Sequence, residues 1–281
     1  MNSKRLKIIL TILVLTFFTA SCEPVKHNTS SAAIAIPDKY GALISEKILL
    51  SGGNAVDAAI AAGFSLAVTY IDAGNIGGGG FMLIQMNGES AFLDYREKAP
   101  LASYRDMYID NHGEVIKNAS LIGGLAIGVP GTVSGFWEAH RRFGSLPWET
   151  LIEPAIKLAE EGFIPAKILV DDIHSMDEWF GDRTNFKKYF SKIRVNEPFK
   201  QPELAKTLKR IAEFGADDFY RGKTAKMIVE EMNRSNGLIT TEDLENYNAV
   251  WREPLRSNWR EYEIVSAPPP SSGGFAIIQL H

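Results

Sequence analysis

The sequence predicts a mixed fold in which α-helices alternate with a few short β-strands. Several segments have the apolar periodicity of a helix, and polar or glycine residues mark their ends. One apolar run, residues 81–86, is followed by Asn87-Gly88 and a second run at 91–95, which is the pattern of a β-hairpin. The chain has 281 residues, 45% hydrophobic and 23% charged, which is enough for a sizeable core. Its net charge of -4 gives no electrostatic reason to expect nucleic-acid binding.

The first 21 residues are expected to be an export signal. Basic residues precede an apolar run, Ile8 to Phe18, and small residues follow it. That run is too short for a membrane span, which needs about 20 apolar residues. The expected location is therefore outside the cytoplasm, either as a periplasmic or outer-membrane-associated lipoprotein or as a secreted protein.

The only cysteine, Cys22, stands directly after the small residues. Its placement resembles a bacterial lipobox, although Thr19 stands where leucine is usual. The sequence therefore favours lipidation at Cys22 and a membrane anchor, with a simple secretory signal as the alternative. Residues 22–33 are expected to form a flexible tether before a domain at 34–281. A single cysteine excludes an internal disulfide.

Two helices are expected after the tether. The first covers 40–50 and stops at Ser51-Gly52-Gly53. Asn54 caps the second, at 55–70, with Asp57 as its capping-box partner. This second helix is apolar nearly all round, so we expect it to be buried. Further elements are expected as helices at 130–143, 147–161, 202–214 and 223–235, a short helix capped by Thr240 and Asp243, and a strand at 261–265.

Four consecutive glycines, residues 77–80, connect the buried helix to the hairpin. A dinucleotide site needs the order strand, glycine loop, helix, and here the order is reversed. The residues alone allow two interpretations of this glycine run. The run is a flexible or tightly bent connection, or it allows close backbone approach to another segment or a ligand.

Residue chemistry by itself does not name a reaction. The five histidines are scattered, and none has metal-ligand spacing to another histidine or to the cysteine. No G-x-S-x-G nucleophile motif is present. Acidic pairs such as Asp217-Asp218 are interpreted as solvated surface. No metal site and no cofactor are expected.

Five long blocks carry a family resemblance. In chain order they are SGGNAVDAAIAAGFSLAVTYIDAGNIGGGGFMLI, LDYREKAP, GVPGTVSGFWEAHRRFG, GLITTEDLENYNAVWREPL and APPPSSGG. Together they resemble the gamma-glutamyltransferases, which are N-terminal nucleophile hydrolases. The resemblance implies an α+β fold, an αββα sandwich. It also implies a precursor that cleaves itself to expose a threonine whose α-amine acts as base.

The resemblance assigns a role to Arg96. In this family the arginine of the block that matches LDYREKAP grips the α-carboxylate of the gamma-glutamyl group. A guanidinium suits this task because its planar fork can bind a carboxylate with two hydrogen bonds. The alternative is a structural salt bridge from Arg96 to Glu97 or Asp94. Under the resemblance, the glycines form a close-packed turn that delivers the hairpin to the sandwich and contact no ligand.

The family's nucleophilic threonine lies beyond the APPPSSGG block, and no residue here matches it. The resemblance therefore implies no catalytic residue within 1–281, which would be a partial large subunit that lacks the small-subunit portion of the sandwich. Its expected partners are that small subunit, a gamma-glutamyl donor such as glutathione, and an amino-acid, peptide or water acceptor. The chain alone is expected to be inactive and poorly soluble.

Three functions compete. The first is gamma-glutamyl transfer with glutathione hydrolysis. The second is another reaction on the same scaffold, in an acylase or an enzyme that processes poly-gamma-glutamate. The third is a non-enzymatic exported binding module.

Overall fold

The computed structural model describes residues 32–280. The predicted export signal, Cys22 and most of the predicted tether lie outside the described residues. From Ile36 onward the described residues form one compact unit. Among the residues described, no helix has the length and apolar character that crossing a membrane requires.

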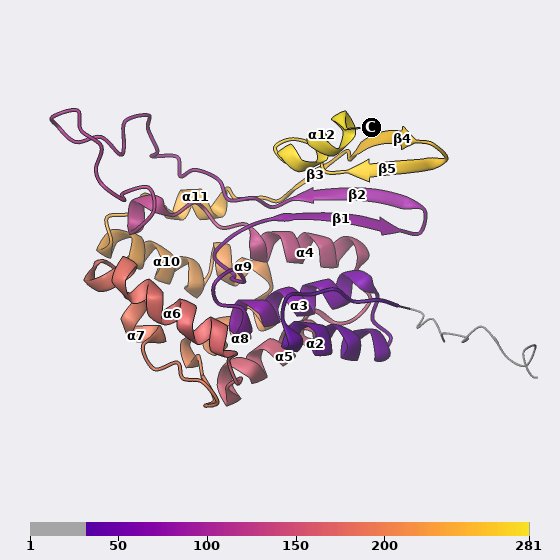
Figure 1. Ribbon diagram of the computed structural model, residues 1–281, viewed down its shortest axis with the longest axis horizontal. Coiled ribbons are helices and arrows are strands. Elements are labelled where there is room, and N and C mark those ends of the chain that lie inside the picture. Colours follow the sequence, from indigo (N-terminus) through magenta and orange to yellow (C-terminus); the bar gives the residue numbers. More distant parts are fainter. Residues whose placement is uncertain (1–31, 281) are drawn as a thin grey trace, which may run out of the picture. The chain divides into compact units, whose positions relative to one another are not determined.

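The predicted buried helix lies at the centre of the helical layer. It is α3 (Ala55–Thr69), and α2 (Lys39–Leu50) precedes it (Figure 1). Asn54 accepts hydrogen bonds from the first turn of α3, and Asp57 accepts one from the Asn54 backbone, so the predicted capping box is present. Phe64 is fully buried on α3. The expected burial of this helix is therefore confirmed.

The hairpin also forms as predicted. Strands β1 (Phe81–Met86) and β2 (Glu89–Asp94) pair in antiparallel register, from Phe81 opposite Asp94 to Met86 opposite Glu89. The turn residues Asn87 and Gly88 both have positive φ angles, 53° and 80°, which an Asn-Gly turn accommodates. Strand β3 (Val250–Arg252), which the sequence did not predict, joins the other side of β2.

A second sheet lies near the C-terminal end. Strands β4 (Leu255–Trp259) and β5 (Tyr262–Ser266) pair antiparallel, and α12 (Ser272–Gln279) contacts both. In Figure 1, β4, β5 and α12 lie on one side of β1 and β2, and α3 and α4 (Thr132–Phe143) lie on the other. Within the described part of the chain, this arrangement places two β layers between helices.

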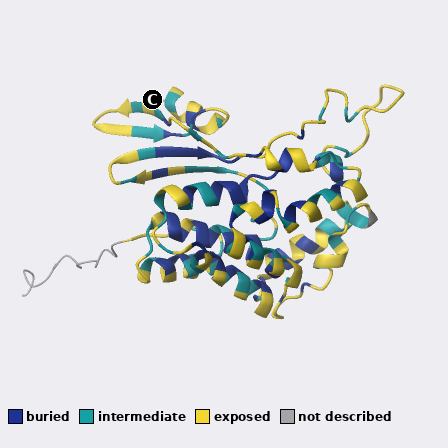
Figure 2. Cartoon of the chain, turned by 180° about the vertical axis from the view of Figure 1, so that it is seen from behind, coloured by how far each residue is buried: buried dark blue, intermediate teal, exposed yellow. Residues whose placement is uncertain are grey.

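The remaining helices surround α3 and α4. They are α5 (Trp148–Glu161), α6 (Lys167–Phe180), α7 (Phe186–Phe190), α8 (Pro202–Phe214), α9 (Ala216–Tyr220), α10 (Lys223–Arg234) and α11 (Thr241–Glu245), with short 3-10 turns at Gly124–Ala126 and Gly181–Arg183. Figure 2 shows buried residues concentrated in β2, α3 and α4, whereas the long segment 101–123 is largely exposed. The core therefore lies between the first sheet and the helices.

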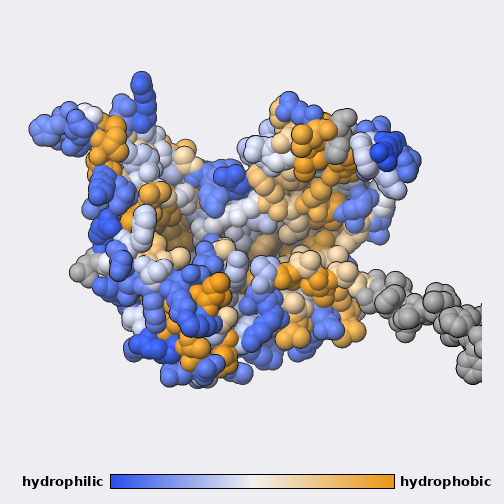
Figure 3. All heavy atoms as spheres, in the orientation of Figure 1, coloured by the Kyte–Doolittle hydropathy of each residue, from blue (hydrophilic) through white to orange (hydrophobic). Residues whose placement is uncertain are grey.

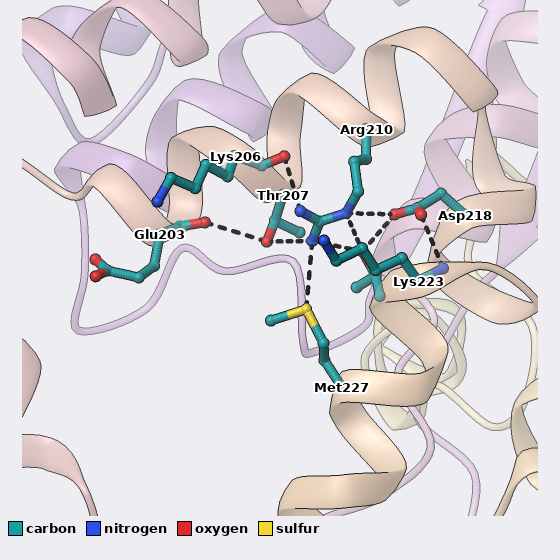
Figure 4. A network of polar contacts seen from close by, with 8 residues as sticks. Glu203, Lys206, Thr207, Arg210, Asp218, Lys223 and Met227 are labelled. Carbon is teal, nitrogen blue, oxygen red and sulfur yellow. Dashed lines mark hydrogen bonds and ion pairs between the residues drawn. The ribbon is translucent and has the colours of Figure 1, made fainter.

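A buried ion pair between Arg210 of α8 and Asp218 of α9 connects these two helices, close to the start of α10 (Figure 4). The Arg210 Nε atom lies 3.3 Å from Asp218 Oδ2, and the Arg210 guanidinium also donates to Thr207 and Thr224 at 2.9 Å. The Lys223 N–H donates to Asp218 at 3.1 Å. Asp218 is only 5% exposed. The interpretation of Asp218 as solvated surface was therefore wrong, because an arginine from α8 makes burial of this carboxylate tolerable.

Candidate functional site

Arg96 lies two residues beyond the end of β2, and its side chain is open to solvent. The side chain is 55% exposed, and its Nε atom lies 3.7 Å from the Glu97 carboxylate, which is itself 39% exposed. The guanidinium carbon lies 5.6 Å from the centre of the Phe81 ring. An exposed ion pair of this kind contributes about 0–1 kcal/mol, so it holds the guanidinium only weakly. The charged group is accessible to a ligand carboxylate.

Asp94, the other predicted salt-bridge partner, is engaged elsewhere. It is buried, and its Oδ2 atom accepts a hydrogen bond of 2.8 Å from Arg252 on β3. Its Oδ1 atom accepts the backbone N–H of Arg96 at 3.1 Å. Asp94 therefore fixes the Arg96 backbone and leaves the guanidinium free of a second acidic partner.

The Arg96 carbonyl is held by a tyrosine from a distant part of the chain. The Tyr247 hydroxyl donates to it at 2.8 Å. The Tyr247 ring stacks on Tyr220 with 5.5 Å between ring centres and 10° between planes. A tyrosine hydroxyl is already protonated at neutral pH, and burial raises the pKa of both tyrosines further above the ordinary value. Neither tyrosine was recognised in the sequence, although Tyr247 belongs to one of the blocks that carry the resemblance.

The four glycines let their own backbone pack closely against the backbone of two other segments, at the end of β2 and at the start of α4. Gly80 and Tyr95 exchange two backbone hydrogen bonds, of 3.0 and 3.2 Å. The Gly78 carbonyl accepts the N–H groups of Gly131 and Thr132, at the start of α4. A Cβ atom on Gly79 would lie 2.5 Å from the Tyr95 carbonyl oxygen. The prediction of a close-packed turn is therefore confirmed, and the approach is to another segment of the chain.

Tyr95 itself anchors this turn to α4. A Cβ atom on Gly135 would lie 2.2 Å from the Tyr95 ring, so the first turn of α4 packs directly on it. Burial raises the pKa of Tyr95 to about 12. The residue before Arg96 is therefore fixed within the core, while the next side chain faces solvent.

The surface near the end of β2 is concave. Figure 3 shows a hollow between the exposed segment 101–123 and the part of the molecule that holds β4, β5 and α12. The start of segment 101–123 is fixed to α11 by a hydrogen bond, in which Asp243 accepts the Leu101 N–H at 2.6 Å. The end of β2 lies near the base of the hollow in the orientation of Figure 1.

Metal-ligand clusters and grooves are the other places in the described residues where a ligand could bind. Within residues 32–280, no group of three or more His, Cys, Asp and Glu side chains is arranged to hold a metal ion. A groove of about 730 Å³ lies beside α7 and α8, and Arg96 is not among its lining residues. The candidate site is therefore Arg96 with the backbone clamp formed by Asp94, Arg252 and Tyr247.

Comparison with known proteins gives a family match over most of the chain. The sequence model of the family described as Gamma-glutamyltranspeptidase matches residues 41–281. A glutathione hydrolase proenzyme of Pseudomonas aeruginosa is 51% identical over 93% of this chain and 47% of its own length. That of Escherichia coli K12 is 44% identical over 92% of this chain and 46% of its own length. The chain spans about half the length of these curated relatives.

A solved structure gives the same result for the fold. The gamma-glutamyltranspeptidase from Pseudomonas nitroreducens, solved in complex with L-DON, superposes with a TM-score of 0.87. It is 53% identical to this chain, and the match covers 89% of this chain and 74% of the solved one. The α+β class and the αββα type predicted from the sequence are thereby confirmed.

Proposed function

The chain belongs to the gamma-glutamyltranspeptidase family, and from this premise we propose that the protein cleaves gamma-glutamyl bonds. It hydrolyses glutathione or passes the gamma-glutamyl group to an amino-acid or peptide acceptor. The observation that carries the proposal is Arg96, a solvent-facing guanidinium on a backbone that is fixed on both sides. In this proposal Arg96 binds the α-carboxylate of the donor through two parallel hydrogen bonds.

The nucleophile in this proposal is the N-terminal threonine of a second subunit, cleaved from the same precursor. Its hydroxyl oxygen attacks the gamma-amide carbon, and its own α-amine takes the hydroxyl proton. The amide nitrogen leaves as a protonated amine, which is cysteinylglycine when the donor is glutathione. Water or an acceptor amine then attacks the acyl-enzyme and regenerates the threonine. Arg96 holds the donor in place during both steps.

We expect the purified full-length gene product to release glutamate and cysteinylglycine from glutathione. Residues 22–281 alone should release neither, since the attacking group lies outside them in this proposal. The measurement is product formation from glutathione, from a poly-gamma-glutamate and from an acylated cephalosporin. Turnover of either of the last two without turnover of glutathione would replace the proposal with the corresponding alternative. Ligand binding without turnover of any substrate would favour the exported binding module.

We propose that the protein is exported and anchored by lipid at Cys22. The support is the position of Cys22 after a basic and apolar leader. One acyl chain gives only marginal membrane binding, so stable anchoring requires the several chains of a mature lipoprotein.

Replacing Cys22 by alanine should move the full-length protein from the membrane fraction to the soluble fraction and abolish labelling with a radioactive fatty acid. Ser21→Ala changes the neighbouring residue and serves as the control, with labelling retained. Unchanged membrane association of the Cys22→Ala protein would reject the lipid anchor and favour a simple secretory signal.

A further inference from the structure

We propose that Tyr247 is a positioning residue for Arg96 in donor recognition. The hydroxyl of Tyr247 holds the Arg96 peptide at the orientation from which the guanidinium meets the donor α-carboxylate. The inference rests on the proposed function, because it assigns Tyr247 to the same donor site. Tyr247 itself acts through Arg96 and does not touch the donor.

The first argument is that the Arg96 backbone is held on both sides by a distant part of the chain, directly by Tyr247 and through Asp94 by Arg252. Its N–H donates to Asp94 at 3.1 Å, and Asp94 is held by Arg252, 158 residues away along the chain. Its carbonyl accepts from Tyr247, 151 residues away, at 2.8 Å. Both anchors come from the segment that ends in β3. The guanidinium, by contrast, is restrained among the described residues by an exposed ion pair with Glu97 and by the Phe81 ring 5.6 Å away. The fixed backbone therefore determines the point from which the Arg96 side chain extends.

The second argument is that Tyr247 is itself rigidly placed. Its ring stacks on Tyr220, and the ammonium of Lys98 lies 4.8 Å from the ring centre. A Cβ atom on Gly131 would lie 2.1 Å from the Tyr247 hydroxyl oxygen, so the absence of a side chain there leaves room for the hydroxyl. A donor site of this kind needs its groups held within about 0.5 Å. Tyr247 meets that need for the Arg96 carbonyl.

Tyr220 offers a matched control in the same cluster. It is buried like Tyr247, and its hydroxyl donates to the Pro130 carbonyl at 2.8 Å and accepts the Ser134 N–H at 3.2 Å. These partners lie at the start of α4 and not on the Arg96 peptide. Tyr220→Phe therefore removes a buried hydroxyl that also binds a backbone carbonyl, without releasing Arg96.

The test compares Tyr247→Phe with Tyr220→Phe in the full-length protein. Tyr247→Phe should raise KM for a donor that carries the α-carboxylate by roughly three- to tenfold, the loss of one hydrogen bond, with little change in kcat. Tyr220→Phe should leave that KM unchanged, although both variants lower the melting temperature. A donor that lacks the carboxylate should not distinguish Tyr247→Phe from the wild type, because its binding does not use Arg96.

Two further variants make the result decisive. Arg96→Lys combined with Tyr247→Phe should show no greater rise in KM than Arg96→Lys alone, because both act on one contact. Should Tyr247→Phe not fold, Arg252→Lys loosens the other anchor and should raise KM in the same donor-dependent way. If Arg96→Lys raises KM but Tyr247→Phe behaves like Tyr220→Phe, the positioning role is wrong and the proposed function stands. If Arg96→Lys leaves KM unchanged, Arg96 does not bind the donor carboxylate, and the positioning role of Tyr247 is rejected with it.

Discussion

Replacing Arg96 by lysine in the full-length protein should lower kcat/KM for gamma-glutamyl donors by an amount equivalent to about 2–5 kcal/mol. Lysine keeps the charge, but its ammonium cannot form the two parallel hydrogen bonds of a guanidinium with a carboxylate, and losing such a charge-assisted pair with the bound donor is costly. The measurement is steady-state hydrolysis of glutathione at several concentrations. Stability should change little, because the Arg96–Glu97 pair is exposed.

Arg105 supplies a matched control for this change. Its Nε atom lies 3.7 Å from the next residue, Asp106, which is the same separation as between Arg96 and Glu97. Arg105 is 95% exposed, in the segment 101–123. Arg105→Lys should therefore leave kcat/KM unaltered. Equal effects of the two substitutions would show that the loss at Arg96 reflects surface charge and not a carboxylate contact.

Gly79→Ala should destabilise the full-length protein by about 3 kcal/mol. The new Cβ atom would lie 2.5 Å from the Tyr95 carbonyl oxygen, 2.8 Å from the Glu97 nitrogen and 3.0 Å from the Arg96 carbonyl carbon. All three are backbone atoms, so no side-chain rotation relieves the overlap, and the cost lies at the upper end for overpacking. The measurement is the free energy of unfolding from denaturant titration. Because the displaced backbone carries Arg96, donor KM should rise as well.

Gly77→Ala is the control for this glycine. The nearest atom to its added Cβ would be the Asn75 side-chain oxygen at 4.0 Å, which is an ordinary contact. An alanine also lowers the conformational entropy of the unfolded chain, so Gly77→Ala should be within about 1 kcal/mol of the wild type. Equal stabilities for the two alanine variants would contradict the close backbone approach at Gly79.

The elements that the sequence predicted correctly are those with local signals. The α3 helix begins at Asn54, where the side chains of Asn54 and Asp57 form a capping box within three residues. The β1–β2 hairpin turns at Asn87-Gly88, which tolerate positive φ. In both cases the residues that determine the structure are neighbours in the chain, so a single sequence contains the necessary information.

The elements that escaped prediction depend on partners far along the chain. Strand β3 has only three residues, and it forms because β2, whose Leu93 pairs with Trp251, offers a free edge far earlier in the chain. The burial of Asp218 depends on Arg210 from a different helix. The clamp on Arg96 likewise joins residues 94–96 to residues 247–252. Sequence reasoning identified Arg96 itself only through the family resemblance, because nothing in its local sequence separates it from an exposed surface arginine.

A double cycle on Arg96 tests the central claim most directly. The wild type and Arg96→Lys proteins are each assayed with a gamma-glutamyl donor and with the same donor lacking its α-carboxylate. Because the two changes remove opposite ends of one interaction, the decarboxylated donor should react poorly with the wild type and be nearly indifferent to Arg96→Lys. Fully additive losses would mean that Arg96 does not touch the carboxylate, and its ion pair with Glu97 would then be its principal role.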